Sequence, residues 1–334
     1  MSQKPLVRIS DLNVQFKGQR NVFAVNGLSI NLMPGQVLGI LGESGSGKSV
    51  TLKSLLRLLP ENRTEIHGLI EVLGQDVMKL KSSELSSFRG GVASMIFQDP
   101  MLALDPVYTI GDQIAEVVTR HHGLGRKEAL GYALEMLKKV RIPSPERRLK
   151  AYPHEISGGM RQRAMIALAL AGNPKLLLAD EPTTALDASV QMQVLLLLRE
   201  LQKESGMGMI FVTHDIGVAV EICDSVAVMY AGQIVETGTI RDIVKDAKHP
   251  YTKGLLAANL HGAERGKRLE TIPGAPPLLD KLPTACSFAP RCAYVQDACL
   301  TQPPQAEIIS KNRTLRCILE KIPHKEDKTN QILS

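Results

Sequence analysis

A glycine-rich segment at residues 42–49 has the composition and spacing of a loop that binds phosphate. Its glycines allow successive backbone N–H groups to turn toward one anion, and a helix that follows adds the positive end of its dipole. Lys48 can then reach the outer phosphates of a nucleotide, and Ser49 can offer its hydroxyl to Mg²⁺. The alternative is a glycine-rich turn that binds nothing. The residues predicted to contact nucleotide here are Gly42, Ser44, Gly45, Gly47, Lys48 and Ser49.

Two adjacent acids, Asp180 and Glu181, follow the apolar run at residues 176–179. An aspartate at such a strand end can associate with Mg²⁺, and a neighbouring carboxylate can orient or deprotonate water. An isolated acid pair is usually a solvated strand end. Here the phosphate loop precedes it and Thr-Ala-Leu-Asp at residues 184–187 follows, which favours the functional interpretation.

A second candidate anion site is the segment Ser157-Gly158-Gly159, followed by Met160 and an apolar stretch typical of a helix. A serine and two glycines at a helix N-terminus present free backbone N–H groups to an anion. A simple N-capped helix is the alternative. With the two motifs above, this segment resembles the signature of the ATP-binding-cassette (ABC) family, usually written LSGGQ. In that family the segment closes on ATP held by a partner's phosphate loop, so the resemblance implies a dimer with two composite sites.

The resemblance covers nearly all of residues 5–240 and implies further roles. It implies that Gln98 senses Mg²⁺ and water, that Glu181 is the catalytic carboxylate and that His214 contacts the γ-phosphate. A single histidine at a strand end is more often structural, but its four aligned partners favour the catalytic role. The remaining implied positions are Phe16 for stacking on adenine, with Phe23 as a substitute, Ser49, Gln98 and Asp180 for Mg²⁺, and Asp187 at the dimer interface.

The elements needed to position these groups can be read from the apolar pattern. Short apolar runs at residues 37–41, 176–179 and 209–212 predict buried parallel strands. The chemistry-bearing residues follow these strands, where parallel sheets gather their ligands. Leucines 52, 55, 56 and 59 predict a helix ended by Pro60, and residues 99–171 predict a helical subdomain. Together with the family resemblance, this pattern implies an α/β fold, a P-loop NTPase of the ABC type with a RecA-like core.

Charge and composition narrow the function classes. Residues 1–240 carry 25 basic and 24 acidic side chains, whereas residues 241–334 carry 15 and 10. A nucleic-acid-binding protein would show a concentrated basic stripe with a readable motif, so we expect no nucleic-acid partner. No secretory signal and no apolar run of membrane-spanning length are visible. If the protein works at a membrane, other chains must supply the spans.

The C-terminal third contains Cys286, Cys292, Cys299 and Cys317. This part resembles the C-terminal extension of ATPase subunits from dipeptide, oligopeptide and nickel ABC importers, which also carry Met at the position of Met160. An intracellular ATPase argues against disulfides. The resemblance implies a 4Fe–4S cluster on the four cysteines; zinc and four plain buried thiols are the alternatives.

These observations predict an ABC nucleotide-binding domain at residues 1–250, an extension at 251–322 and a tail at 323–334. The predicted function is to bind and hydrolyse ATP, with Mg²⁺, at the cytoplasmic face of the inner membrane, as the peripheral subunit of a peptide importer. The implied partners are a second ATPase, expected to be a paralogue, two integral membrane permease subunits and a solute-binding protein. Nickel, glutathione or another small solute are alternatives, as are a soluble ABC ATPase of DNA repair or translation and a non-hydrolysing regulator.

Overall fold

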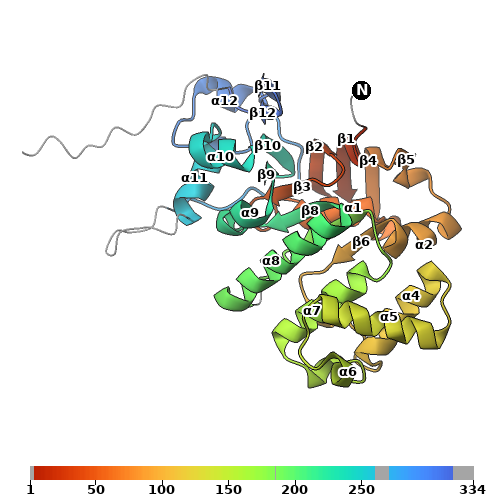
Figure 1. Cartoon of the computed structure of the whole chain (residues 1–334). Helices are drawn as coiled ribbons and strands as arrows, with labels where there is room; N and C mark the ends of the chain where they lie inside the picture. Colours follow the sequence, from red (N-terminus) through yellow and green to blue (C-terminus); the bar gives the residue numbers. More distant parts are fainter. Residues whose placement is uncertain (1–3, 185, 260–270, 319–334) are drawn as a thin grey trace, which may run out of the picture.

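The computed structural model describes residues 4–184, 186–259 and 271–318. Within them the chain forms two β-sheets, a helical lobe and a C-terminal extension (Figure 1). The strands are β1 (Val7–Phe16), β2 (Val22–Leu32), β3 (Val37–Leu41), β4 (Thr64–Val72), β5 (Gln75–Asp76), β6 (Ala93–Ile96), β7 (Leu176–Asp180), β8 (Gly208–Thr213), β9 (Ser225–Tyr230), β10 (Gln233–Thr239), β11 (Glu307–Ser310) and β12 (Arg313–Leu315).

The helices lie between and around these strands. They are α1 (Lys48–Leu55), α2 (Ser82–Gly91), α3 (Pro100–Ala103), α4 (Ile110–His122), α5 (Arg126–Lys139), α6 (Pro145–Arg148), α7 (Gly158–Leu170), α8 (Ala188–Ser205), α9 (Ile216–Ile222), α10 (Ile240–Asp246), α11 (Pro250–Asn259) and α12 (Asp297–Thr301), with 3-10 turns η1 (Glu61–Arg63), η2 (Val77–Lys79), η3 (Pro153–Glu155) and η4 (Ala289–Arg291).

The larger sheet has the strand order β11-β12-β10-β9-β3-β8-β7-β6. Strands β9, β3, β8, β7 and β6 pair in parallel. The whole of β3, β7 and β8 is buried, which explains the uninterrupted apolar runs at residues 37–41, 176–179 and 209–212. The three predicted strands are therefore confirmed. Because β3, β8 and β7 are neighbours, the residues that follow them meet at one edge of the sheet.

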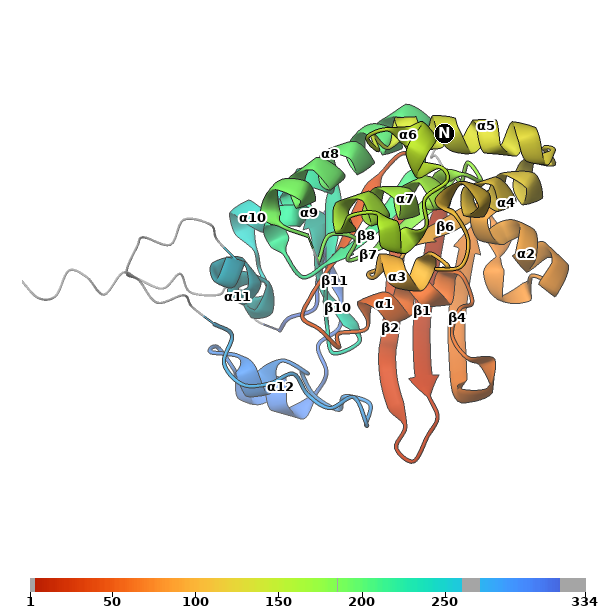
Figure 2. The same ribbon diagram turned by 90° about the horizontal axis from the view of Figure 1, so that it is seen from below.

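The smaller sheet is antiparallel, in the order β2-β1-β4-β5. Figure 2 shows β1, β2 and β4 side by side, with α1 next to them. Apolar side chains of this sheet, including Ile9, Leu28 and Ile70, share one buried core with Leu52 and Leu55 of α1. The phosphate loop thus runs into a helix that is anchored between the two sheets.

The predicted length of α1 is wrong. The sequence pattern continues to Leu59, but α1 ends at Leu55. Arg57 adopts a left-handed backbone with φ of 49° and donates from its guanidinium to the Leu80 carbonyl at 2.8 Å. Leu56 and Leu59 are nevertheless buried, so they extend the apolar core without continuing the helix.

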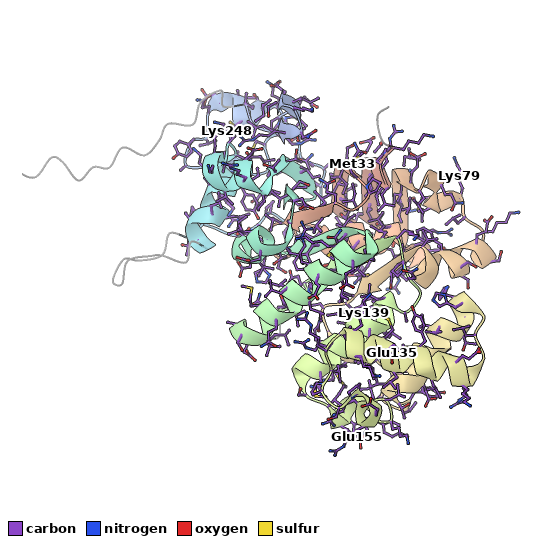
Figure 3. All side chains as sticks on the ribbon, in the orientation of Figure 1. Met33, Lys79, Glu135, Lys139, Glu155 and Lys248 are labelled. Carbon is purple, nitrogen blue, oxygen red and sulfur yellow. The ribbon has the colours of Figure 1, made fainter. Side chains whose placement is uncertain are left out.

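Residues 99–171 are mainly helical and fold into a lobe formed by α3 to α7. Ion pairs join this lobe to α8: Lys139, labelled in Figure 3, lies 3.1 Å from Glu204, and Arg141 pairs with Glu200. The lobe and the C-terminal extension lie at opposite ends of the molecule in both ribbon views (Figures 1 and 2).

The extension continues the core sheet. Strand β12 pairs with β10, and β11 pairs with β12. Arg313 of β12 donates to Glu236 of β10 at 2.9 Å, and the Glu236 side chain is fully buried. The division at residue 250 stays a prediction, and the predicted tail at 323–334 lies outside the described residues. No helix among the described residues is long and apolar enough to cross a membrane.

Candidate nucleotide site

The loop between β3 and α1 has the backbone of an anion-binding turn. Gly47 has a φ of 103°, and a Cβ atom there would lie 2.3 Å from the Ala24 carbonyl oxygen. Gly45 has a φ of 80° with open space around it. A side chain at either position would strain the backbone, and at Gly47 it would also collide with β2. The glycine spacing is therefore a geometric requirement of this turn.

Lys48 lies at the first position of α1 with its side chain folded over the loop. Its Nζ donates to the carbonyl oxygens of Gly42 and Glu43, each at 2.8 Å. Burial lowers the pKa of Lys48, while nearby carboxylates, foremost that of Glu181, act in the opposite direction. The ammonium group thus lies at the mouth of the loop, where it can meet a phosphate oxygen.

Ser49 and Asp180 form an oxygen pair suited to a divalent cation. The Ser49 hydroxyl donates to Asp180 Oδ1 at 2.7 Å. Burial raises the pKa of Asp180, and the hydrogen bond from Ser49 partly opposes that rise. A hydroxyl and a carboxylate at the phosphate loop are the ligands that Mg²⁺ takes together with nucleotide phosphates.

Three polar side chains lie close to one carboxylate oxygen of Glu181. Its Oε2 accepts from the Thr184 hydroxyl at 2.9 Å, lies 3.2 Å from His214 Nδ1, and is 3.5 Å from Gln98 Nε2. Glu181 also has a left-handed backbone with φ of 44°, which is costly for a non-glycine residue. Its N–H donates to the Val212 carbonyl of β8 at 3.1 Å, which holds this conformation. The carboxylate is thereby fixed beside the loop.

A cavity of about 800 Å³ opens above the phosphate loop. It brings together most of the predicted site from five separate parts of the sequence. The predicted residues that line it are Phe16, Ser44, Gly45, Gly47, Lys48, Ser49, Gln98, Glu181 and His214. Phe23 is not in this lining. Gly42 and Asp180 lie behind the lining and act on it through Lys48 and Ser49.

The second predicted anion site is not brought to this cavity. Ser157 and Gly158 are exposed at the start of α7, where the Ser157 hydroxyl accepts from the Met160 N–H at 3.4 Å. Gly159 packs close to Val190 of α8. Asp187 is exposed and caps α8 by accepting from the Val190 N–H at 3.0 Å, a bond that lowers its pKa. Ala185, in the same predicted segment as Asp187, lies outside the described residues.

The C-terminal extension also contributes to the cavity. Its lining includes five residues from beyond position 250: Leu255, Ala258, Thr271, Ile272 and Leu279. The backbone places Leu279 there, since its carbonyl accepts from the Phe23 N–H of β2 at 2.7 Å. No periodicity or motif in this proline-rich segment pointed to the nucleotide site.

Three of the four predicted cysteine ligands lie in the same small region. The Cys286 N–H donates to the Cys299 carbonyl at 3.0 Å. Burial raises the pKa of the Cys286 and Cys292 thiols, and neighbouring cysteines add to the rise. Across residues 4–184, 186–259 and 271–318, no group of three or more His, Cys, Asp or Glu side chains is arranged to hold a metal ion. The cluster and the zinc alternative therefore stay predictions.

Comparisons with known proteins identify the family of this chain. Residues 25–184 match the family described as ABC transporter, and residues 235–299 match the one described as Oligopeptide/dipeptide transporter, C-terminal region. The chain is 47% identical to a putative peptide import ATP-binding protein of Brucella melitensis biotype 1, over 95% of this chain and 98% of the relative. A second such protein from the same organism is 46% identical over 94% of each chain.

Solved structures give the same fold. The dimeric ATP-binding cassette MJ0796 in a post-hydrolysis state with ADP and Pi superposes with a TM-score of 0.63 at 29% identity, covering 70% of this chain and 99% of that one. The protein cbiO1 of Clostridium perfringens, part of the transporter complex cbiONQ, also gives 0.63, at 26% identity, covering 73% and 92%. The predicted P-loop ABC fold is confirmed, and the chain belongs to the family of ATP-binding, ATP-hydrolysing proteins of ABC transporters.

Proposed function

We propose that this chain is the ATP-hydrolysing subunit of a membrane importer for di- or oligopeptides. The match of residues 235–299 to the C-terminal region of oligopeptide and dipeptide transporters is the observation that carries the substrate class. The names of the Brucella relatives support the same solute. Nickel, glutathione and another small solute remain the alternative cargoes for the same ATPase.

The proposed chemistry begins with binding of the triphosphate. Backbone N–H groups of the glycine loop and the Lys48 ammonium hold the phosphate oxygens, and Phe16 stacks on adenine. Mg²⁺, when bound, neutralises charge on the β- and γ-phosphates, and Ser49, Asp180 and Gln98 are the residues that would hold it. The hydrogen bond between Ser49 and Asp180 supports this pairing.

Glu181 is the proposed group that orients the attacking water and accepts its proton. The convergence of Thr184, His214 and Gln98 on Glu181 Oε2 supports this role, since it fixes the carboxylate that must face the water. His214 then holds the γ-phosphate in line. Its side chain is 55% exposed and lines the cavity in which the nucleotide would lie. Hydrolysis by such a site rests on positioning and charge stabilisation.

A second ATPase subunit is proposed to complete the site. Its Ser157-Gly158-Gly159 segment would face the phosphates held by this chain, and Asp187 would lie at the interface. The exposure of Ser157, Gly158 and Asp187 here supports this arrangement, because these groups do not line the cavity of their own chain. We propose a paralogue as the partner, with a solute-binding protein acting on the complex.

The helical lobe is the proposed contact to the two integral membrane permease subunits, which would place this chain at the cytoplasmic face of the inner membrane. Three large apolar side chains on one short stretch support a docking role. Leu102 is 82% exposed, Val107 69% and Tyr108 57%. Such a cluster on a soluble lobe is typical of a surface that meets another protein.

The four cysteines are proposed to hold a 4Fe–4S cluster with a structural role, with zinc as the alternative. The hydrogen bond from the Cys286 N–H to the Cys299 carbonyl at 3.0 Å supports a shared site, as does the rise that neighbouring cysteines add to the pKa of Cys286 and Cys292. Four thiolates are the usual donor set of both centres. Iron and zinc content of the anaerobically purified chain, compared with Cys292→Ser, tests this: loss of neither metal on substitution contradicts it.

Uptake in the native cell tests the proposed function. Replacing the chain by Lys48→Ala should abolish accumulation of a labelled dipeptide, because the lysine is proposed to hold the phosphates of ATP. Nickel uptake should stay unchanged, because nickel is not the proposed cargo. Lys79→Ala is the matched control, since the Lys79 side chain is 84% exposed and away from the cavity lining. Unchanged dipeptide uptake with Lys48→Ala, or loss of nickel uptake in its place, contradicts the proposal.

A further inference from the structure

An arginine of the C-terminal extension reaches the phosphate loop. Arg291, at the end of η4, pairs with Glu43, the second residue of the loop, although the two are 248 positions apart in the sequence. Nη1 donates to Glu43 Oε2 at 2.6 Å and Nη2 to Oε1 at 3.0 Å. The pair is thus bidentate, and the Arg291 side chain is only 5% exposed. Bidentate pairs of low exposure are the strong ones among protein ion pairs.

The guanidinium of Arg291 is fixed before any ligand arrives. Its Nε donates to the Pro273 carbonyl at 2.8 Å, and its Cζ lies 5.8 Å from the centre of the Tyr230 ring. The hydrogen bonds to Glu43 raise the pKa of Arg291, which keeps the group charged. A held, permanently charged fork of this kind places its partner carboxylate in one orientation.

Glu43 is held from a second direction by α11. The Tyr251 hydroxyl accepts from the Glu43 N–H at 2.8 Å. Tyr251 is itself fully buried and packs against the rings of Tyr230 and Phe288. The Glu43 carbonyl in turn accepts from Lys48 Nζ at 2.8 Å. The side chain and backbone of one loop residue are therefore set by the extension on one side and by the phosphate-binding lysine on the other.

A carboxylate in this position is unfavourable for a loop that binds a triphosphate. Glu43 lines the cavity, so its charge would repel the phosphates across a short distance in a partly buried site. Arg291 offsets that charge and turns both carboxylate oxygens toward the extension. Removal of the arginine alone would leave an uncompensated negative charge beside the ligand.

We propose that Arg291 is a positioning residue for the nucleotide site: it neutralises Glu43 and, with Tyr251, holds the phosphate loop in its ligand-binding shape. The affinity of the loop for ATP is therefore set in part by the C-terminal extension of the same chain. This inference rests on the proposed function to the extent that the loop is taken to bind the phosphates of ATP.

The test measures equilibrium binding of MgATP to the purified full chain. Arg291→Met should weaken binding about tenfold, as expected for a lost charge-assisted contact. Adding Glu43→Gln to Arg291→Met should restore affinity to within about threefold of the unchanged chain, because the uncompensated charge is removed. A merely structural role of Arg291 predicts no such rescue, so a double variant as weak as Arg291→Met overturns the proposal.

Arg316→Met is the matched control. Its side chain also joins the extension to the core, by donating to the Ile234 and Pro304 carbonyls at 3.2 Å each, but neither partner belongs to the loop. It should leave MgATP affinity within about twofold of the unchanged chain. Equal weakening by Arg316→Met and Arg291→Met overturns the proposal.

Two further variants keep the test decisive if Arg291→Met fails to fold, as judged by thermal melting. Arg291→Lys retains the charge and should bind MgATP better than Arg291→Gln, whereas equal affinities overturn the inference. Loss of ATP binding in Lys48→Ala checks the nucleotide loop separately. If Lys48→Ala loses binding and Arg291→Met does not, the inference fails while the proposed function stands.

Discussion

The edge of the core sheet that carries Glu181 and the exposed face that carries Ser157 differ in how far this chain completes them. At the sheet edge, Ser49 is bonded to Asp180, and three polar groups converge on Glu181. On the other face, Ser157 and Asp187 cap helices and otherwise point to solvent. One chain thus gathers the proposed nucleotide-binding groups at the sheet edge, whereas Ser157 and Asp187 stay outside that cavity, as the proposed composite site between two subunits would require.

The largest expected effect, and the clearest functional difference between the two regions, is that of Ser157→Arg. This change places a bulky cation on the exposed face, where a partner's nucleotide would approach, and should lower ATP hydrolysis by the assembled transporter about 100-fold. Binding of MgATP to the isolated chain should change less than about twofold, because Ser157 does not line the cavity. Loss of MgATP binding by the isolated chain would contradict the conclusion that Ser157 lies outside the nucleotide cavity of its own chain.

A smaller effect is expected from Leu279→Ser, which alters the wall that the extension adds to the cavity. Losing part of an apolar contact with the nucleotide should cost about 1 kcal/mol, or about fivefold in the dissociation constant of MgATP. Leu278→Ser is the control, because Leu278 is 79% exposed and does not line the cavity. If both variants bind MgATP equally, the extension is not part of the nucleotide site.

The last effect concerns stability and not nucleotide binding, at the junction beneath the loop. His249 is buried, its Nδ1 accepts from the Tyr251 N–H at 3.0 Å, and burial lowers its pKa to about 3. Because an unfolded histidine titrates near 6.5, the unfolded chain binds the extra proton first, and stability falls as pH drops below about 6.5. The loss should be about 1.4 kcal/mol for each pH unit in that window.

His249→Asn keeps a hydrogen-bond acceptor but cannot titrate. Urea unfolding at pH 7.5 and pH 5 should therefore show a loss of unfolding free energy that is about 2 kcal/mol smaller in the variant than in the unchanged chain. Parallel losses in the two proteins would mean that His249 does not contribute to acid sensitivity.

The parts of the molecule that were predictable are those in which local sequence and global structure agree. Buried apolar runs identified β3, β7 and β8, and the polar residues after them identified the site edge. The end of α1 was not predictable in this way. Leu56 and Leu59 satisfy a helical pattern, yet Arg57 turns left-handed and the chain buries both leucines outside the helix.

Contacts between distant segments could not be predicted from the sequence. The pairing of Arg291 with Glu43 and of Arg313 with Glu236 joins residues 248 and 77 positions apart. No periodicity links such residues, since each is an ordinary charged residue in its own segment. Their partners follow only from the addition of β12 to the core sheet and of α11 beneath the loop.

Glu181→Gln tests the central claim most directly, by separating nucleotide binding from hydrolysis in the same protein. The amide preserves the size of the side chain but cannot accept a proton from water. MgATP affinity should stay within about threefold of the unchanged chain, while steady-state ATP hydrolysis by the assembled transporter should fall at least about 100-fold. Near-normal hydrolysis by this variant would contradict the account, because it would remove Glu181 from the chemistry that the sheet edge is built to perform.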